Sequence, residues 1–233
     1  SLCHIPFFPT PDDHEFASFD PATGISDTKF FPSMVNYMDK KIGQLVQKVK
    51  DAGLENNTLI IYFGDNGTPD QIKSRFNGHS IVGGKGKPIT RGTHVPLFFY
   101  LPGKIAPNSV SSNLIAFTDM LPTIADLAGL HLPPFGILDG LSFYPSIFGL
   151  PGTTRQWSFC HFRPMHNDST TFYRYIQNTN YKYYDTTHSV RDTLFYNIVT
   201  DPNELRSKSS NTLSANEIKT KKEFMQILSK MHN

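Results

Sequence analysis

The chain has 233 residues, of which 38% are hydrophobic and 18% charged, and its formal net charge is +2. This composition is typical of a globular protein, and the length allows one sizeable core or a core with a small second unit. So small a net charge gives no sign of a nucleic-acid partner, and no apolar run approaches the ~18 residues of a membrane span. The two cysteines are too few for a disulfide framework or a structural zinc site.

The first elements alternate between helical and strand patterns. Residues 1–32 are rich in Pro and Asp and predict a surface loop. Apolar residues at helical spacing then predict a helix that Ser33 caps and Gly53 ends. Continuous apolar runs at 58–63 and 95–101 predict two strands that are buried on both faces.

The polar, glycine-rich segment 64–92 between these strands is too long for an ordinary connection, so we expect a functional loop there. A short strand over 114–117 and a helix over 119–127 follow, and Gly129 ends the helix. Together these elements predict an α/β fold with a largely parallel sheet over residues 1–150. Only two or three core strands are visible where about four to six are usual, so we expect further strands upstream of Ser1.

The last part of the chain, residues 151–233, has a different character. Asn178-Thr-Asn180 predicts a hairpin loop, and a helix is expected near 214–231. Short aromatic strands are expected at 156–162, 172–177, 181–184 and 193–197. The sequence therefore predicts a small antiparallel sheet with one helix as a second unit.

The strongest site signal is the run Gly-Asp-Asn-Gly at 64–67, directly after the first predicted strand. Open α/β sheets bind ligands at the carboxyl ends of their strands. The Asp65 carboxylate and the Asn66 carbonyl are hard oxygen ligands that suit Ca²⁺ or Mg²⁺. The alternative is a hairpin turn at Asn66-Gly67, and position alone leaves the two about evenly matched.

Two further segments could contact an anion. The run Gly-Gly-Lys-Gly-Lys at 83–87 lets the backbone approach a sulfate or phosphate, and Lys85 supplies a compact positive charge, although such stretches are more often solvated loops. His4 is held between prolines, which suits an acid or an anion contact, but a lone histidine is more often structural.

Taken together, these segments resemble the type I sulfatases of the alkaline phosphatase superfamily. No single motif decides this, but their order along nearly the whole chain is specific. The motifs are His4-Ile-Pro-Phe-Phe-Pro-Thr-Pro, Phe63-Gly-Asp65-Asn66-Gly-Thr, Gly83-Gly-Lys85-Gly, Gly92-Thr-His-Val-Pro-Leu, Leu101-Pro-Gly-Lys-Ile, Phe117-Thr-Asp-Met-Leu-Pro-Thr-Ile-Ala-Asp-Leu-Ala-Gly129 and Leu194-Phe-Tyr-Asn-Ile-Val-Thr-Asp-Pro-Asn-Glu-Leu. The resemblance implies a partial alkaline-phosphatase-like αβα core and the hydrolysis of sulfuric esters.

The resemblance also implies roles for the site residues. Asp65 and Asn66 would be ligands of a calcium ion, with Mg²⁺ as the alternative. Lys85 and His4 would be catalytic and would contact the sulfate of a small-molecule or carbohydrate substrate. The family uses a formylglycine made within Cys/Ser-x-Pro/Ala-x-Arg, and neither Cys3 nor Cys160 lies in such a motif.

We therefore expect the formylglycine in an N-terminal half of the same fold that lies outside this chain. The isolated chain would then be inactive, and the resemblance favours a periplasmic or secreted protein. Two alternatives stay open. One is a phosphodiesterase or phosphonate-ester hydrolase of the same superfamily, and the other is a non-catalytic fragment or degenerate homologue that only binds.

Overall fold

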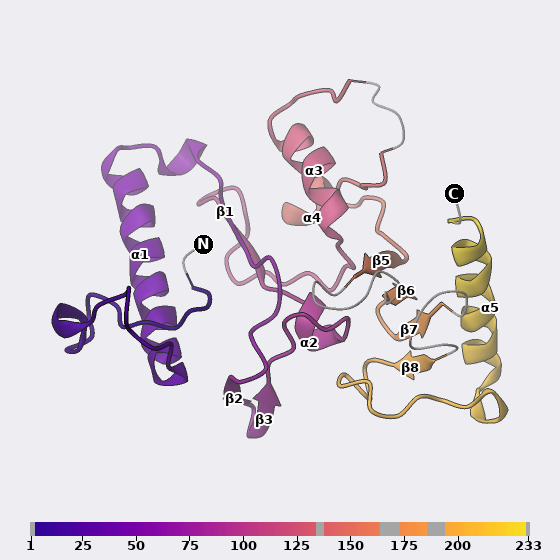
Figure 1. Ribbon diagram of the computed structural model, residues 1–233. Coiled ribbons are helices and arrows are strands. Elements are labelled where there is room, and N and C mark those ends of the chain that lie inside the picture. The colour runs from indigo at the N-terminus through magenta and orange to yellow at the C-terminus, as the bar shows by residue number, and fades with distance from the viewer. Residues whose placement is uncertain (1–2, 134–137, 164–172, 186–193, 232–233) are drawn as a thin grey trace.

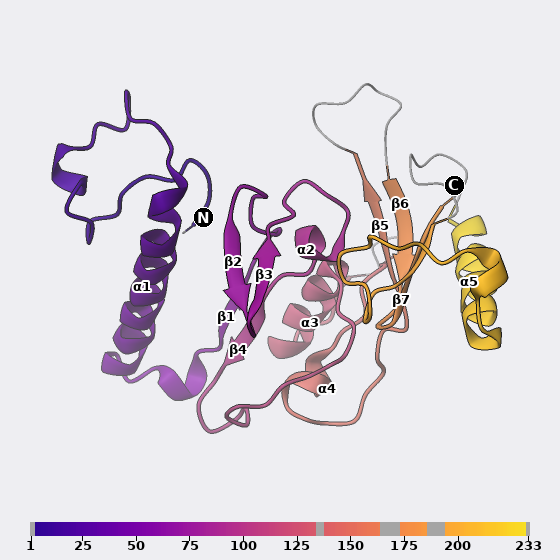
Figure 2. The same cartoon turned by 90° about the horizontal axis from the view of Figure 1, so that it is seen from below.

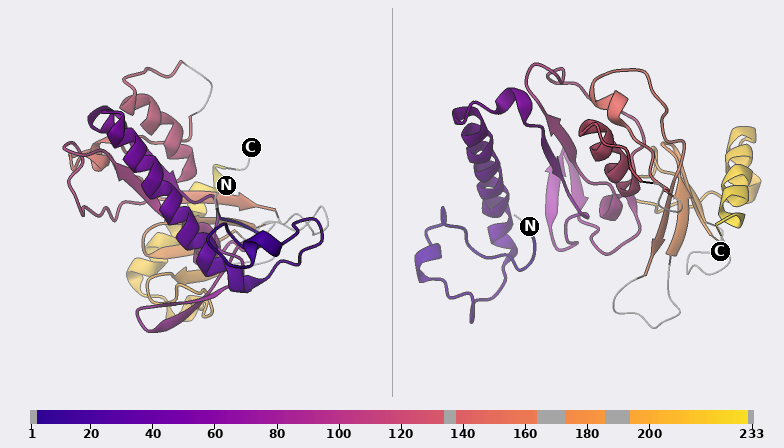
Figure 3. Two further views of the ribbon diagram at one scale, coloured as in Figure 1. Left: turned by 90° about the vertical axis from the view of Figure 1, so that its left-hand side faces the viewer. Right: turned by 90° about the horizontal axis from the view of Figure 1, so that it is seen from above.

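The computed structural model describes residues 3–133, 138–163, 173–185 and 194–231, and its elements lie in successive layers (Figure 1). In Figure 2 helix α1 lies at one side, followed by the β1–β4 pair with the β2–β3 hairpin beside it. Helices α2 and α3 come next, then the sheet of β5 to β8, and α5 forms the opposite side; the right-hand view of Figure 3 shows the same order. None of the helices in the described ranges is both long and apolar enough to cross a membrane.

Helix α1 spans Phe31–Asp51 and ends as predicted, because Gly53 adopts a φ of 70°. The predicted cap is wrong. The N-cap residue is Phe30, and Pro32 occupies the first turn. The Ser33 hydroxyl instead donates to Asp13 at 2.9 Å and so ties the N-terminal loop to the helix. The predicted loop over residues 1–32 also holds two 3₁₀ turns, η1 (Phe16–Ser18) and η2 (Thr28–Phe30).

The two predicted core strands exist as β1 (Ile60–Phe63), which follows the 3₁₀ turn η3 (Glu55–Asn57), and β4 (Leu97–Tyr100). They pair directly with each other and run antiparallel, so the predicted parallel order is wrong for this pair. The chain turns back after β1 and returns alongside it, with no crossover helix that would set β4 parallel. Burial on both faces is wrong as well, since Phe98 is 62% exposed. The mixed α/β class itself is confirmed.

The segment between β1 and β4 contains more regular structure than the sequence indicated. Strands β2 (Lys73–Phe76) and β3 (His79–Val82) form a hairpin, and the single-turn helix α2 spans Thr90–Thr93. The hairpin loop is Asn77-Gly78, whose φ angles of 48° and 79° define a type I′ turn.

The predicted helix over 119–127 is α3 (Met120–Leu127), which follows the 3₁₀ turn η4 (Phe117–Asp119) and precedes the short helix α4 (Tyr144–Ile147). The predicted strand over 114–117 is reduced to a single bridge between Leu114 and Arg155. Asp119 is buried and accepts the Nε hydrogen of Arg155 at 2.8 Å.

The C-terminal elements match the prediction. Strands β5 (Ser158–Phe162), β6 (Tyr173–Gln177), β7 (Tyr181–Tyr184) and β8 (Phe195–Asn197) form one antiparallel sheet in chain order. The 3₁₀ turn η5 (Ser210–Thr212) leads into helix α5 (Ala215–Ser229).

The two faces of this sheet are covered differently. Alternating residues Ile176, Tyr183 and Phe195 pack against α5, whereas Tyr175 and Tyr184 lie on the opposite face. The division of the chain into units 1–150 and 151–233 stays a prediction. Arg155 forms a bridge with Leu114 and an ion pair with Asp119, so the two parts are in contact.

Candidate functional site

Asp65 and Asn66 lie where the chain leaves β1, at the predicted position. The Gly64 amide donates to the Pro96 carbonyl at 3.1 Å, which fixes the start of the turn. The Asp65 carboxylate accepts the Asn66 amide at 3.0 Å, and the side-chain NH₂ of Asn66 donates to the Gly67 carbonyl at 3.0 Å. Of the two polar groups of the Asn66 side chain, this bond uses the NH₂ group and not the oxygen. The alternative of a hairpin turn at Asn66-Gly67 is wrong, because β1 pairs with β4 and the hairpin of this segment is β2–β3.

The chemistry of these two oxygen donors suits a hard cation, but they are only part of a shell. Calcium takes about six to eight oxygen ligands. Within the described ranges, no group of three or more His, Cys, Asp or Glu side chains comes together that could hold a metal ion. Asp65 and Asn66 therefore fit the edge of a calcium site whose remaining ligands would come from other residues.

Backbone hydrogen bonds hold the Lys85 segment beside this turn. The Thr68 carbonyl accepts the amides of Gly84 at 2.8 Å and Lys85 at 2.9 Å, and the Gly67 amide donates to the Gly92 carbonyl at 2.9 Å. Both ends of the Lys85 segment are thus bonded to Gly67 and Thr68, the two residues that directly follow Asp65 and Asn66. The structure brings three of the four predicted site residues into one hydrogen-bonded unit.

Several glycines are required in this unit because backbone segments pass too closely for a side chain. A Cβ on Gly67 would lie 2.0 Å from the Arg91 carbonyl oxygen, and one on Gly92 would lie 2.1 Å from the Lys87 carbonyl oxygen. On Gly83 it would lie 2.1 Å from the Pro69 carbonyl oxygen. Anion approach was predicted for the glycines of 83–87 only, and this packing was not predicted; the recurrence of glycine at both ends of the segment was the available signal.

The two lysines of the segment differ in their partners. The Lys87 ammonium pairs with Asp70 at 2.9 Å, and this hydrogen bond lowers the pKa of the Asp70 carboxyl below its ordinary value. The Lys85 ammonium forms no ion pair with any residue of the described ranges. Lys85 is therefore a half-buried cation that is available to an anionic ligand, and its contact to sulfate stays a prediction.

His4 lies on an exposed loop that is anchored to the same region. Phe7 is 1% exposed and packs against Phe30 and Ile72, and the Ile72 carbonyl accepts the Gly83 amide at 3.0 Å. The Nδ1 atom of His4 contacts the carbonyl of Ile5. No hydrogen bond within the described ranges joins the His4 side chain to Asp65 or Lys85.

Two family models match the chain. The Sulfatase model covers residues 2–130, and the model for the C-terminal part of N-sulphoglucosamine sulphohydrolase covers residues 89–232.

Curated relatives include human arylsulfatase A, which is 34% identical over 146 residues, or 62% of this chain and 28% of the human protein. A sulfatase of Formosa agariphila is 29% identical over 184 residues, or 71% of this chain and 32% of its own length. The chain thus spans about a third or less of these relatives.

The fold is that of solved sulfatases. One structure, solved in complex with its substrate D-glucosamine-2-N,6-O-disulfate, matches with a TM-score of 0.69 and 24% identity over 87% of this chain and 39% of its own. A sulfatase from Pseudoalteromonas sp. matches with a TM-score of 0.68 and 23% identity over 98% of this chain and 46% of its own. The matched models, the sequence relatives and the fold agree, and the chain belongs to the sulfatase family.

Proposed function

We propose that this chain is the C-terminal part of the catalytic unit of a sulfuric ester hydrolase. The observation that carries the proposal is Lys85, whose ammonium forms no ion pair with a described residue and whose backbone is hydrogen-bonded beside the oxygen donors Asp65 and Asn66. A cation and two hard ligands on adjacent, hydrogen-bonded segments are suited to the oxygens of a sulfate group.

Each residue has a role in the proposed reaction. Asp65 and Asn66 would hold one side of a calcium ion, which supplies a Lewis acid for the sulfate oxygens when it is bound. Lys85 neutralises the negative charge that develops on the transferred group. The nucleophile, a formylglycine in this family, would come from a segment outside this chain.

His4 is proposed to protonate the leaving oxygen. The Nδ1 atom of His4 faces the Ile5 carbonyl, so Nε2 is the ring nitrogen that would carry and donate the proton in the acid role. Protonation of the departing alcohol by a positioned acid is the step that this atom could perform.

A carbohydrate sulfate is the substrate class that we propose. One family model describes an N-sulphoglucosamine sulphohydrolase, and one solved relative binds a disulfated glucosamine. Other relatives are named arylsulfatases, so an aryl sulfate is the comparison substrate.

The test measures sulfate release by the whole protein. Lys85→Ala and His4→Ala should each lower turnover at least ~100-fold, because each removes a contact to the transferred group. Lys87→Ala is the matched control: the same change two residues away, at a lysine already neutralised by Asp70, should leave turnover near that of the parent.

Two further measurements separate the alternatives. Asp65→Ala should remove bound calcium, as counted by elemental analysis, and retained stoichiometric metal would exclude Asp65 as a ligand. Turnover of a phosphate diester but not of a sulfate ester would instead assign the site to a phosphodiesterase. Normal activity of Lys85→Ala would remove Lys85 from the reaction.

A further inference from the structure

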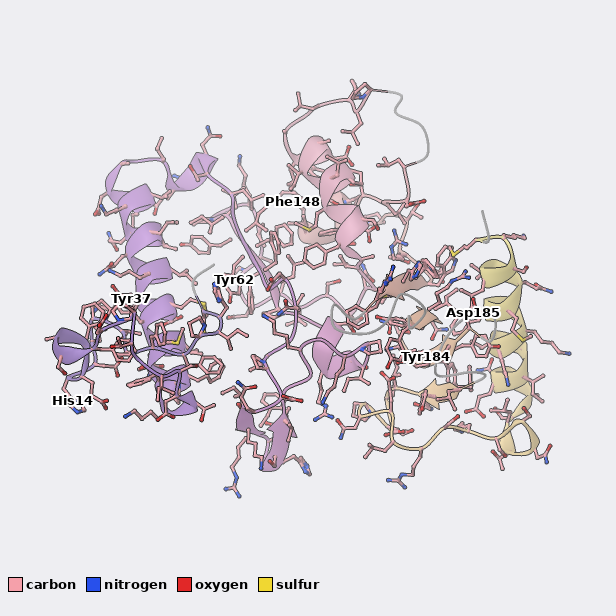
Figure 4. All side chains as sticks on the ribbon, in the orientation of Figure 1. His14, Tyr37, Tyr62, Phe148, Tyr184 and Asp185 are labelled. Atoms are coloured by element: carbon pink, nitrogen blue, oxygen red, sulfur yellow. The ribbon has the colours of Figure 1, made fainter. Side chains whose placement is uncertain are left out.

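A buried ion pair links the C-terminal sheet to the segment that follows Lys85. Lys182 on β7 and Glu204 have side chains that are 0% exposed, and their Nζ and Oε1 atoms lie 3.0 Å apart. Lys182 Nζ also lies 3.8 Å from the ring centroid of Tyr175, and the Tyr184 hydroxyl donates to Oε2 of Glu204 at 2.5 Å. Figure 4 shows Tyr184 on the side of the sheet that faces α2.

The partners of this ion pair on the other side are backbone atoms near Lys85. Lys182 donates to the Pro88 carbonyl, and the Tyr184 hydroxyl lies 3.3 Å from the same oxygen. Oε1 of Glu204 accepts the Thr90 amide at 3.1 Å. Pro88 lies between Lys85 and α2, and Thr90 is the first residue of α2, so the network bonds to the chain three and five residues beyond Lys85.

Because the network is buried, it defines one position for this segment. Two charges withdrawn from water are tolerated only when hydrogen bonds and their mutual attraction satisfy them. Movement of Pro88 or Thr90 would leave Lys182 or Glu204 short of a partner with no water to replace it. An apolar contact at this place would tolerate small shifts, whereas the hydrogen bonds require defined distances.

We propose that Lys182, Glu204 and Tyr184 are positioning residues that hold the Lys85 segment in its sulfate-binding conformation. The proposal rests on the sulfate contact assigned to Lys85 above. It gives the C-terminal sheet a part in the reaction through its bonds to the backbone of residues 88–90.

The experiment combines network variants with Lys85→Ala in the whole protein. Tyr184→Phe removes one hydroxyl, and the double variant Lys182→Met/Glu204→Gln removes both charges of the ion pair together. Each should raise the inhibition constant of inorganic sulfate and lower kcat/KM by about 10-fold or more. In the Lys85→Ala background the same changes should have less than a 2-fold effect, because the group they position is gone.

The matched control is Lys208→Met, which breaks a different ion pair, that with Glu217, in the same part of the chain. It should lower the melting temperature while the inhibition constant of sulfate stays unchanged. If the network variants lose the same factor with and without Lys85, or if the folded variants bind sulfate normally, the positioning role is overturned.

A second readout does not depend on sulfate chemistry. Amide hydrogen exchange over residues 85–92 should become faster in Lys182→Met/Glu204→Gln, while exchange in α5 stays as in the parent. This outcome supports the positioning role even if Lys85→Ala proves fully active, a result that would refute only the sulfate contact. Unchanged exchange over 85–92 would overturn the positioning role by itself.

Discussion

Replacing Gly92 with alanine tests whether close backbone packing sets the geometry of the site. The new Cβ would lie 2.1 Å from the carbonyl oxygen of Lys87 and 2.4 Å from that of Gly84, where contacts below 3.0 Å essentially never occur. Both atoms are backbone, so no side chain can move aside. The Lys87 oxygen must retreat by about 0.9 Å, and Lys85 lies between the two displaced residues.

A displacement of about 1 Å in a catalytic group can cost roughly 100-fold in rate. We therefore expect Gly92→Ala to lower kcat/KM for a sulfate ester about 100-fold, and to lower the free energy of unfolding by about 1–3 kcal/mol through overpacking. Steady-state kinetics and thermal unfolding of the same preparation measure both quantities.

Gly103→Ala is the control for a loss of stability alone. Gly103 has a φ of 74°, and no atom lies within 4 Å of a Cβ added there. Alanine at this position is therefore strained but displaces no neighbour. It should cost about 1–2 kcal/mol and leave kcat/KM unchanged. If Gly92→Ala behaves like Gly103→Ala, with reduced stability and turnover within a few-fold of the parent, close packing does not set the position of Lys85.

Three other changes bear on stability. Gly43→Ala, in the interior of α1 with no atom within 4 Å of its new Cβ, should stabilise the protein by about 1 kcal/mol and raise Tm. Arg155→Met should cost about 3–5 kcal/mol in denaturant unfolding, because it leaves the Asp119 carboxylate buried without its cation, and adding Asp119→Asn should recover much of the loss. Lys208 and the Ser214 amide lower the pKa of Glu217, so its contribution is present above about pH 4.5 and is lost as the pH falls through the folded pKa; Glu217→Gln should therefore flatten the decline of Tm in this acidic range.

The order of elements could be predicted from the sequence because each carries its own local signal. Helix α5 shows this well: Ser214 accepts the Glu217 amide, and Glu217 in turn accepts the Ser214 amide, a capping box that is visible in the sequence. The hairpin loop over 178–180 likewise depends on Asn178, whose side chain accepts two nearby amides.

The pairing of strands could not be predicted in the same way. The apolar run of β1 is compatible with a parallel or an antiparallel neighbour, and only the path of the intervening segment decides between them. A hairpin turn was an alternative at Asn66-Gly67, whereas the hairpin forms at Asn77-Gly78, where a two-residue loop places Phe76 opposite His79. The same dipeptide at both places shows that the flanking strands decide which one turns.

The candidate site was predictable only in part. Asp65 and Asn66 follow a strand, which identifies them locally, and Lys85 follows its glycines. The network of Lys182 and Glu204 depends on contacts more than 90 residues apart in the chain, as in the 94-residue separation of Lys182 and Pro88. The signal available was alternation along β7, which puts Lys182 and Tyr184 on one face.

A hydrogen bond closes the base of the β2–β3 hairpin, and the turn residues Asn77 and Gly78 are exposed. The Gly83 amide donates to the Ile72 carbonyl at 3.0 Å and so joins the residues that flank the hairpin. Phe76, next to the tip, is 65% exposed. A peptide tag or reporter domain inserted between Asn77 and Gly78 would therefore extend into solvent, and each doubling of its length would cost only about 0.6 kcal/mol. The hairpin offers a place to attach new sequence a few residues from Lys85 without altering the path of the chain through the site.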